Sequence, residues 1–194
     1  MRLIVLSSEC FISEENKLIN SLFSEGLEIF HLRKPRASIE KMRDLISQIE
    51  PKYRNRIALH LIAAESHHEL VKEYGIKRLH FTEDGRSSFE REGEFIYSTS
   101  FHNIEDVKKE GNAFDYYFLS PTFDSISKKG YKGKQIKSPS DKAVALGGMR
   151  LERLSKAKDL GYKNIALLGA IWQKPEDAVE RFVEINNQWN VLNE

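Results

Sequence analysis

A polar loop that follows an apolar run offers the clearest candidate chemistry in the sequence. The run begins at Asp115 and is rich in aromatic residues, and Ser120-Pro121 ends it because proline cannot donate to a sheet ladder. The loop then presents two hydroxyls and a cation, Ser125, Ser127 and Lys128. Such groups, with glycines nearby, suit an anionic ligand and phosphate above all. A solvated surface loop has the same composition, so the rest of the chain must decide.

Eight short apolar runs alternate with amphipathic segments, and each run predicts a buried strand. Helix signals separate them: Ser38 and Asn103 are N-cap candidates, and Gly26, Gly75 and Gly161 are stops. This alternation predicts parallel strands joined by right-handed crossovers. The predicted strands cover residues 3–6, 27–30, 57–61, 78–81, 94–99, 115–119, 142–146 and 164–168.

Eight strands close a (β/α)8 barrel, so we expect an α/β protein with the TIM-barrel fold, although 194 residues is slightly below its usual size. A doubly wound open sheet is the competing architecture, but no Gly-x-Gly-x-x-Gly follows the first predicted strand. Between Gly130 and Lys142 the sequence lacks helical periodicity, so the sixth helix is expected to be short or missing. With no linker or internal repeat, residues 1–194 are predicted to form one barrel domain.

The composition excludes several classes of protein. Lys and Arg number 30 against 29 for Asp and Glu, so a net charge of +1 gives no general attraction to nucleic acid or membrane. One cysteine, Cys10, excludes an internal disulfide and fits a reducing compartment. No apolar run approaches the ~18 residues of a membrane span, and the N-terminal run is too short for a signal peptide. We expect a soluble cytoplasmic protein and leave open whether it forms a homo-oligomer.

Residues at the C-terminal ends of the strands build the active site of such a barrel. Glycine loops follow the last two predicted strands, at Gly147-Gly148 and Gly169-Ala170, where backbone N–H groups commonly bind phosphate. A tight turn between strand and helix is the alternative explanation for Gly147-Gly148. The other candidates at strand ends are His31, Arg33, Lys34, His60, Asp84, Ser100 and His102.

Five segments, in register along nearly the whole chain, resemble motifs of the thiamine-phosphate synthase and thiazole tautomerase superfamily. No segment is decisive alone, but their common order makes the resemblance specific. The resemblance implies a (β/α)8 barrel and an enzyme of thiamine biosynthesis. The segments are His31 to Lys34, Leu79 to Asp84, Ser98 to His102, Ser120 to Lys128, and Ala145 to Met149.

Resemblance to the synthase implies a transferase that joins hydroxymethylpyrimidine diphosphate to thiazole phosphate and releases pyrophosphate. It implies that the two glycine loops hold the thiazole phosphate, and that Mg²⁺ assists with Asp84 as its candidate ligand. The residues expected to act in catalysis are His102, Lys128 and Arg33. Those expected to bind substrate are His31, Lys34, Ser100, Ser125, Ser127, Gly147, Gly148, Gly169 and Ala170.

The sequence departs from the synthase pattern at the metal site. Where that pattern has an Asn-Asp pair after the third strand, this chain reads Leu59-His60-Leu61, without a carboxylate. Asp84 matches the second metal aspartate only with a one-residue gap. Because Mg²⁺ usually takes one or two carboxylates plus phosphate oxygens, this departure counts against the synthase.

The tautomerase branch implies an alternative that needs no metal. It moves a double bond in thiazole carboxylate phosphate by proton transfer, which a histidine performs well near neutral pH, and His102 matches the residue with this role. A third alternative is a non-catalytic paralogue that binds a phosphorylated ligand. The synthase is the first expectation. His60 and His80 are interpreted as barrel-end or core histidines with satisfied hydrogen bonds. A metal site of histidine and aspartate is the alternative, but nothing in the sequence shows zinc-ligand spacing.

Overall fold

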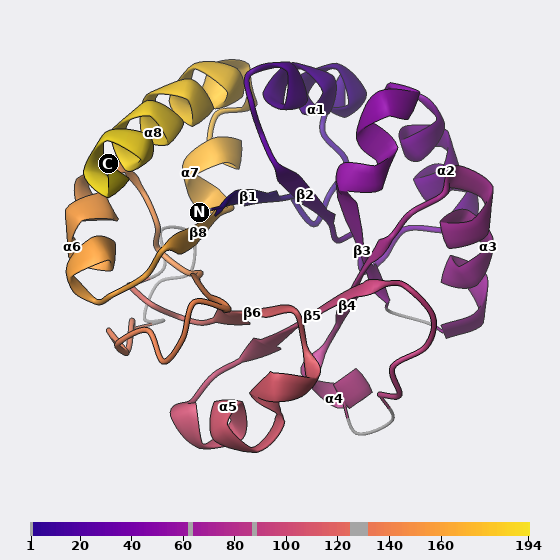
Figure 1. Cartoon of the computed structure of the whole chain (residues 1–194). Helices are drawn as coiled ribbons and strands as arrows, with labels where there is room; N and C mark the ends of the chain where they lie inside the picture. Colours follow the sequence, from indigo (N-terminus) through magenta and orange to yellow (C-terminus); the bar gives the residue numbers. More distant parts are fainter. Residues whose placement is uncertain (1, 62–63, 87–88, 125–131) are drawn as a thin grey trace.

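The computed structural model describes residues 2–61, 64–86, 89–124 and 132–194, and within 64–68 it describes the backbone alone. Eight parallel strands close into a barrel in chain order, with helices around its outside (Figure 1). This confirms the expected TIM-barrel fold. The strands are β1 (Arg2–Leu6), β2 (Ile29–Leu32), β3 (Ile57–Leu61), β4 (Arg78–Phe81), β5 (Ile96–Phe101), β6 (Tyr116–Leu119), β7 (Ala143–Ala145) and β8 (Asn164–Leu167).

The helices that surround the barrel vary widely in length. The helix α8 closes the chain along the outside of the barrel, whereas α4 and α7 are single turns. The helices are α1 (Glu15–Ser24), α2 (Ile39–Ser47), α3 (Ala64–Tyr74), α4 (Glu83–Arg86), α5 (Ile104–Glu110), α6 (Leu154–Asp159), α7 (Gly169–Trp172) and α8 (Ala178–Asn193). Short 3-10 turns cover η1 (Pro51–Arg56), η2 (Gly111–Ala113), η3 (Leu151–Arg153) and η4 (Pro175–Asp177).

Alternation along the strands divides the buried residues into two clusters. One cluster fills the barrel interior with one or two side chains from most strands, for example Ile4, Ala58, Tyr116 and Val144. The other lies between the strands and the helices. Because successive strand residues point to opposite faces, a one-residue error in register would move every polar side chain of a strand between these two places.

The second strand begins two residues later than predicted, at Ile29 rather than Leu27. Leu27 belongs to the end of α1 instead, because its N–H bonds to the carbonyl of Leu22 at 2.9 Å while Gly26 takes a φ of +97°. Such a left-handed glycine with a 6→1 hydrogen bond is a common helix termination. In consequence His31 lies within β2 and faces the barrel interior, and is not in the loop beyond the strand.

The connection between β6 and β7 confirms the prediction of a short or missing sixth helix, because its described residues form no helix. Residues 132–142 run along neighbouring loops, with the N–H of Lys134 bonded to the Pro121 carbonyl at 2.9 Å. Farther on, the N–H of Ser138 bonds to the Leu160 carbonyl at 2.8 Å, and the Tyr162 hydroxyl donates to the Ile136 carbonyl at 2.9 Å. These bonds satisfy backbone groups that a helix would otherwise pair.

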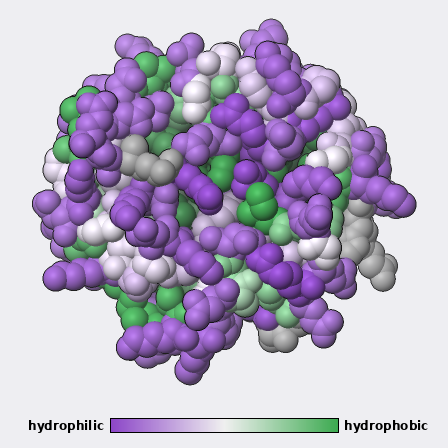
Figure 2. All heavy atoms as spheres, in the orientation of Figure 1, coloured by the Kyte–Doolittle hydropathy of each residue, from purple (hydrophilic) through white to green (hydrophobic). Residues whose placement is uncertain are grey.

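The molecular surface is mainly polar. Hydrophilic residues dominate the face shown in Figure 2, with small hydrophobic groups among them. The exposed large hydrophobic residues of the described chain are Phe11, Leu168 and Val191. No helix in the described ranges has the length and hydropathy needed to cross a membrane.

Candidate functional site

A pocket of about 360 Å³ opens at the C-terminal ends of the strands. Polar side chains from the loops after β1, β2, β4 and β5 meet backbone from the glycine loops after β7 and β8. This is where the active site of a (β/α)8 barrel is expected. The sequence-predicted residues that line it are Arg33, Ser100, His102, Gly147, Gly148 and Gly169.

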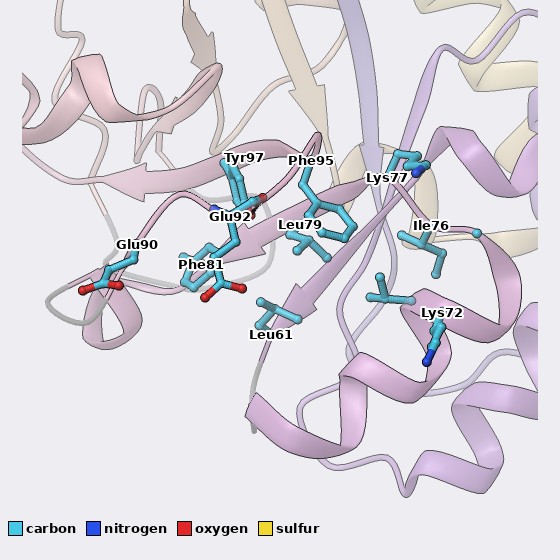
Figure 3. A pocket seen from close by; sticks show the side chains of 12 residues that line it. Leu61, Lys72, Ile76, Lys77, Leu79, Phe81, Glu90, Glu92, Phe95 and Tyr97 are labelled. Carbon is cyan, nitrogen blue, oxygen red and sulfur yellow. Dashed lines mark hydrogen bonds between the residues drawn. The ribbon is translucent and has the colours of Figure 1, made fainter.

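A larger hollow, about 620 Å³, lies on the outside of the barrel between α3 and the strands β4 and β5 (Figure 3). Outward-facing apolar side chains line it, among them Leu79, Phe81 and Tyr97, because α4 is too short to cover β4. Its described lining holds no histidine and none of the sequence-predicted site residues. The smaller pocket is therefore the candidate functional site.

His102 is the best-oriented acid/base group in this pocket. It follows the last residue of β5, and its Nδ1 lies 2.8 Å from the carbonyl oxygen of Ser120. Because a carbonyl can only accept, Nδ1 carries a proton, and the neutral ring has its lone pair on Nε2. That atom lies 3.8 Å from a carboxylate oxygen of Glu83, and the ring is 40% exposed. The geometry therefore presents a proton acceptor with a carboxylate beside it.

Arg33 stands at the rim of the pocket. Its backbone is fixed by Ser7, whose hydroxyl donates to the Arg33 carbonyl at 2.9 Å and accepts from the Arg33 N–H at 2.8 Å. Its guanidinium forms an ion pair with Glu9, which also lines the pocket. Since the Arg33 side chain is 37% exposed, an anionic ligand can reach it, but only in competition with Glu9.

Lys34 has a structural role that the sequence did not indicate. Its ammonium lies 2.7 Å from both carboxylate oxygens of Glu15 and donates to the Cys10 carbonyl at 2.8 Å. Burial is the main cause of both pKa shifts: the pKa of Lys34 is lowered and that of Glu15 is raised. Lys34 does not line the pocket, and this buried ion pair ties the loop after β2 to α1.

The first glycine loop is held tightly against the loop after β6. A Cβ on Gly148, whose φ is +63°, would stand 2.2 Å from the carbonyl oxygen of Asp124. One guanidinium nitrogen of Arg153 donates to the carbonyls of both Asp124, at 2.9 Å, and Gly148, at 3.0 Å. Glycine is thus required by close packing at this place.

The backbone amides of this loop remain available to a ligand. Within the described parts of the chain, neither Gly147 nor Gly148 donates its N–H to another residue. Gly169 lines the same pocket from the first residue of α7, whereas Ala170 is buried and does not line it. The two loops therefore offer backbone N–H donors on one side of the pocket. The residues with which they line it carry no acidic side chain.

Three histidines from neighbouring strands point into the barrel: His31 on β2, His60 on β3 and His80 on β4. Burial lowers the pKa of His31 and His60 well below the ordinary value and that of His80 to about 3, so the rings are neutral at pH 7. His60 and His80 reach the pocket wall, and His80 Nε2 lies 3.2 Å from the Ser100 hydroxyl. His31 pairs in register with Ala58, two residues before His60 on β3, and does not line the pocket.

Comparison with known proteins shows to which family the chain belongs. A model of the thiamine monophosphate synthase family matches residues 2–171, which is most of the chain. The chain belongs to this family. No curated protein sequence matches it significantly.

Solved structures of similar proteins include members of the same family. The crystal structure of thiamine phosphate pyrophosphorylase from Bacteroides thetaiotaomicron is 29% identical over 98% of both chains, with a TM-score of 0.80. Thiamine phosphate pyrophosphorylase from Pyrococcus furiosus is 14% identical, covers 100% of this chain and 97% of its own, and has a TM-score of 0.78. Phosphoribosyl anthranilate isomerase from Thermus thermophilus shares the barrel alone, at 13% identity, 99% and 100% coverage and a TM-score of 0.60.

The pocket is a poor match for the magnesium ion that the synthase resemblance implies. Asp84, its expected ligand, does not line the pocket, and its neighbour Glu83 does. The carboxylates among the described lining are Glu9, paired with Arg33, and Glu83, close to His102. Mg²⁺ needs hard oxygen donors in near-octahedral geometry, which these two engaged carboxylates do not fit. The predicted phosphate ligands Ser125, Ser127 and Lys128 lie outside the described residues.

Sequence reasoning missed three polar groups of this site, Glu9, Glu83 and the Ser120 carbonyl. Glu9 and Glu83 each follow a predicted strand, so the rule that barrel sites gather at strand ends was a signal for both. Glu83 was passed over because the family motif drew attention to Asp84. The Ser120 carbonyl had no signal, since a backbone acceptor is available at every residue.

Proposed function

We propose that this protein is a thiazole tautomerase, which shifts a double bond in a phosphorylated thiazole carboxylate by proton transfer. The observation that carries the proposal is the orientation of His102, which lines the pocket and whose Nδ1–H is bound to the Ser120 carbonyl, so that the lone pair of the neutral ring is on Nε2. A base fixed in one tautomer is prepared to accept a proton without reorganisation. This places first the activity that the sequence alone ranked second.

The proposed reaction is balanced and needs no redox partner. Nε2 of His102 accepts a proton from one ring atom of the substrate, and the electrons of the broken bond remain in the ring as the double bond moves. The imidazolium then returns the proton to another carbon of the substrate. Glu83, 3.8 Å from Nε2, stabilises the imidazolium between the two steps.

The substrate's anionic groups fit the two sides of the pocket. Membership of the family implies a small phosphorylated substrate. The N–H groups of Gly147 and Gly148, which donate to no other residue in the described parts of the chain, and the adjacent Gly169 loop suit the phosphate, because backbone donors bind anions without a competing side chain. Arg33, in the loop after β2, suits the carboxylate of the substrate, which would replace Glu9 as its ion-pair partner.

Thiamine-phosphate synthase is the second candidate, and the Bacteroides relative favours it. That protein carries the name thiamine phosphate pyrophosphorylase and is 29% identical along 98% of the chain. For this reaction the protein would use Arg33 and Ser100 with the Ser125, Ser127 and Lys128 loop to hold a diphosphate. Against this candidate stand the poor match of the pocket to Mg²⁺, since Asp84 does not line it, and the engagement of the Ser100 hydroxyl with His80.

Turnover by the purified protein separates the candidates. We expect isomerisation of thiazole carboxylate phosphate with EDTA present, followed by the change in its ultraviolet absorption. Formation of thiamine phosphate from hydroxymethylpyrimidine diphosphate and thiazole phosphate, only with Mg²⁺, would instead establish the synthase. Binding of thiazole phosphate without turnover in either assay would identify a non-catalytic paralogue.

A further inference from the structure

We propose that His31, His60 and His80 form a binding site for one divalent transition-metal ion, with Zn²⁺ as the reference ion, at the floor of the pocket. One ring nitrogen from each histidine lies within 4.8 Å of those from the other two. Among the residues that the structure describes, no other group of three histidine, cysteine or acidic side chains is placed in this way. The inference goes beyond the proposed function and does not rest on it.

The distance between two of these nitrogens is close to that in a zinc site. His31 Nδ1 lies 3.0 Å from His60 Nε2, a hydrogen bond in which one proton lies between two nitrogens. Zinc–nitrogen bonds of about 2.0–2.1 Å in a tetrahedron put neighbouring nitrogens roughly 3.3 Å apart. A metal ion can therefore replace this proton with a movement of a few tenths of an ångström.

Hydrogen bonds already hold the outer nitrogens of two of the rings. His31 Nε2 lies 2.7 Å from the Tyr116 hydroxyl, and His80 Nδ1 lies 2.9 Å from the Ser98 hydroxyl. Imidazoles that bind metals usually have their second nitrogen fixed in this manner. The arrangement leaves His31 Nδ1 and His80 Nε2 as candidate metal ligands, and His80 Nε2 lies 3.2 Å from the Ser100 hydroxyl.

The chemistry of the donors selects the class of ion. Three neutral imidazoles without a carboxylate favour Zn²⁺, Co²⁺, Ni²⁺ or Cu²⁺ over Mg²⁺ and Ca²⁺. Because His60 and His80 line the pocket, an ion can enter from it, and water or a ligand oxygen takes the fourth position. The His60 and His80 rings are stacked with centroids 4.0 Å apart, so binding requires the His80 ring to turn out of the stack.

The wild-type protein itself provides the first test. Metal-free protein is titrated with Zn²⁺ by calorimetry, and the histidine ring nitrogens are followed by ¹H–¹⁵N NMR. We expect one bound ion and shifts of the three buried imidazoles. No binding would overturn the proposal, as would binding that shifts only the rings of His67, His68 or His102, or that depends on Cys10.

A pair of variants gives the second test. His60→Asn is expected to weaken Zn²⁺ binding by more than ~100-fold, since loss of an outer-shell partner alone costs 10–100-fold. The matched control, His67→Ala/His68→Ala, removes two histidines that do not belong to the proposed ligand set and should leave the affinity within about twofold. Near-UV circular dichroism establishes that each variant is folded. Equal affinity in folded His60→Asn and wild-type protein would contradict the proposed ligand set.

Discussion

The Nδ1–H of His102 donates to the carbonyl oxygen of Ser120 at 2.8 Å, and this bond joins the end of β5 to the end of β6. The contact determines which ring nitrogen carries the proton in the neutral ring, and so leaves the lone pair on Nε2 for the proposed proton transfer. The Lys134 ammonium also holds the His102 backbone in place, because it donates to the His102 carbonyl at 2.7 Å. A loop that replaces a helix thus helps to fix the proposed acid/base residue.

Glu83→Gln should lower kcat for the proposed isomerisation by roughly two- to fivefold, with little change in KM. The reason is the loss of a charge that stabilises the imidazolium of His102, and exposed pairs of this kind are worth at most ~1 kcal/mol. Steady-state kinetics of Asp84→Asn provide the matched control, because Asp84 does not line the pocket. A large loss in Asp84→Asn with none in Glu83→Gln would favour the metal-dependent synthase.

Lys34→Met should destabilise the protein by about 3–5 kcal/mol, because it leaves the Glu15 carboxylate buried without its partner. The double variant Glu15→Leu/Lys34→Met should recover most of this loss in urea unfolding, since both charges are then absent. Its KM should stay within about twofold of the wild-type value. A tenfold or larger rise in KM of the stable double variant would show that Lys34 binds substrate after all.

Gly148→Ala should cost at least ~2 kcal/mol more than Gly75→Ala. The two glycines have almost the same φ, +63° and +64°, so the backbone strain of an alanine should destabilise both variants by the same amount. They differ in space: nothing lies within 4 Å of a Cβ at Gly75, whereas the Asp124 carbonyl blocks it at Gly148. Equal destabilisation in chemical unfolding would mean that the loop does not pack as described.

Tyr162→Phe should change how stability depends on pH in alkaline solution. Burial raises the pKa of Tyr162 to about 12, above its usual 10. The unfolded state therefore loses this proton first, and the contribution of Tyr162 to stability falls as pH rises from about 10 to 12. At pH 8 the variant should be less stable by ~1 kcal/mol, because the bond to the Ile136 carbonyl is lost.

At pH 11 the stability of the variant relative to the wild type should be roughly 1.4 kcal/mol more favourable than at pH 8, which cancels the deficit of ~1 kcal/mol or slightly reverses it. Comparing the variant with the wild type at each pH removes the effects of other titrating groups. A constant difference between the two proteins over this range would contradict the burial of the Tyr162 hydroxyl.

The regular parts of the fold were predictable from the sequence, because they depend on local patterns. Eight apolar runs gave the closed barrel, and the lack of periodicity after Gly130 gave the missing helix. His102, Arg33 and Gly148 were found because strand ends meet at one face of a barrel. Their residue types and their positions after strands were enough to predict that they line the pocket.

The remaining features depend on contacts between distant segments. The burial of Lys34 follows from Glu15, which lies on another element, 19 residues earlier. The histidine cluster needs the register of three strands, and His31 enters it only because Leu27 is used to end α1. Neither the register nor the helix end can be read from residue types alone.

The most direct test of the account is the rate of His102→Asn with thiazole carboxylate phosphate. Asparagine retains a donor toward the Ser120 carbonyl but has no group that can accept and return a proton. We predict a fall in kcat of ~10²–10⁴ with KM nearly unchanged, since a positioned acid/base contributes this much. A His102→Asn variant that isomerises this substrate at the wild-type rate would contradict the central claim.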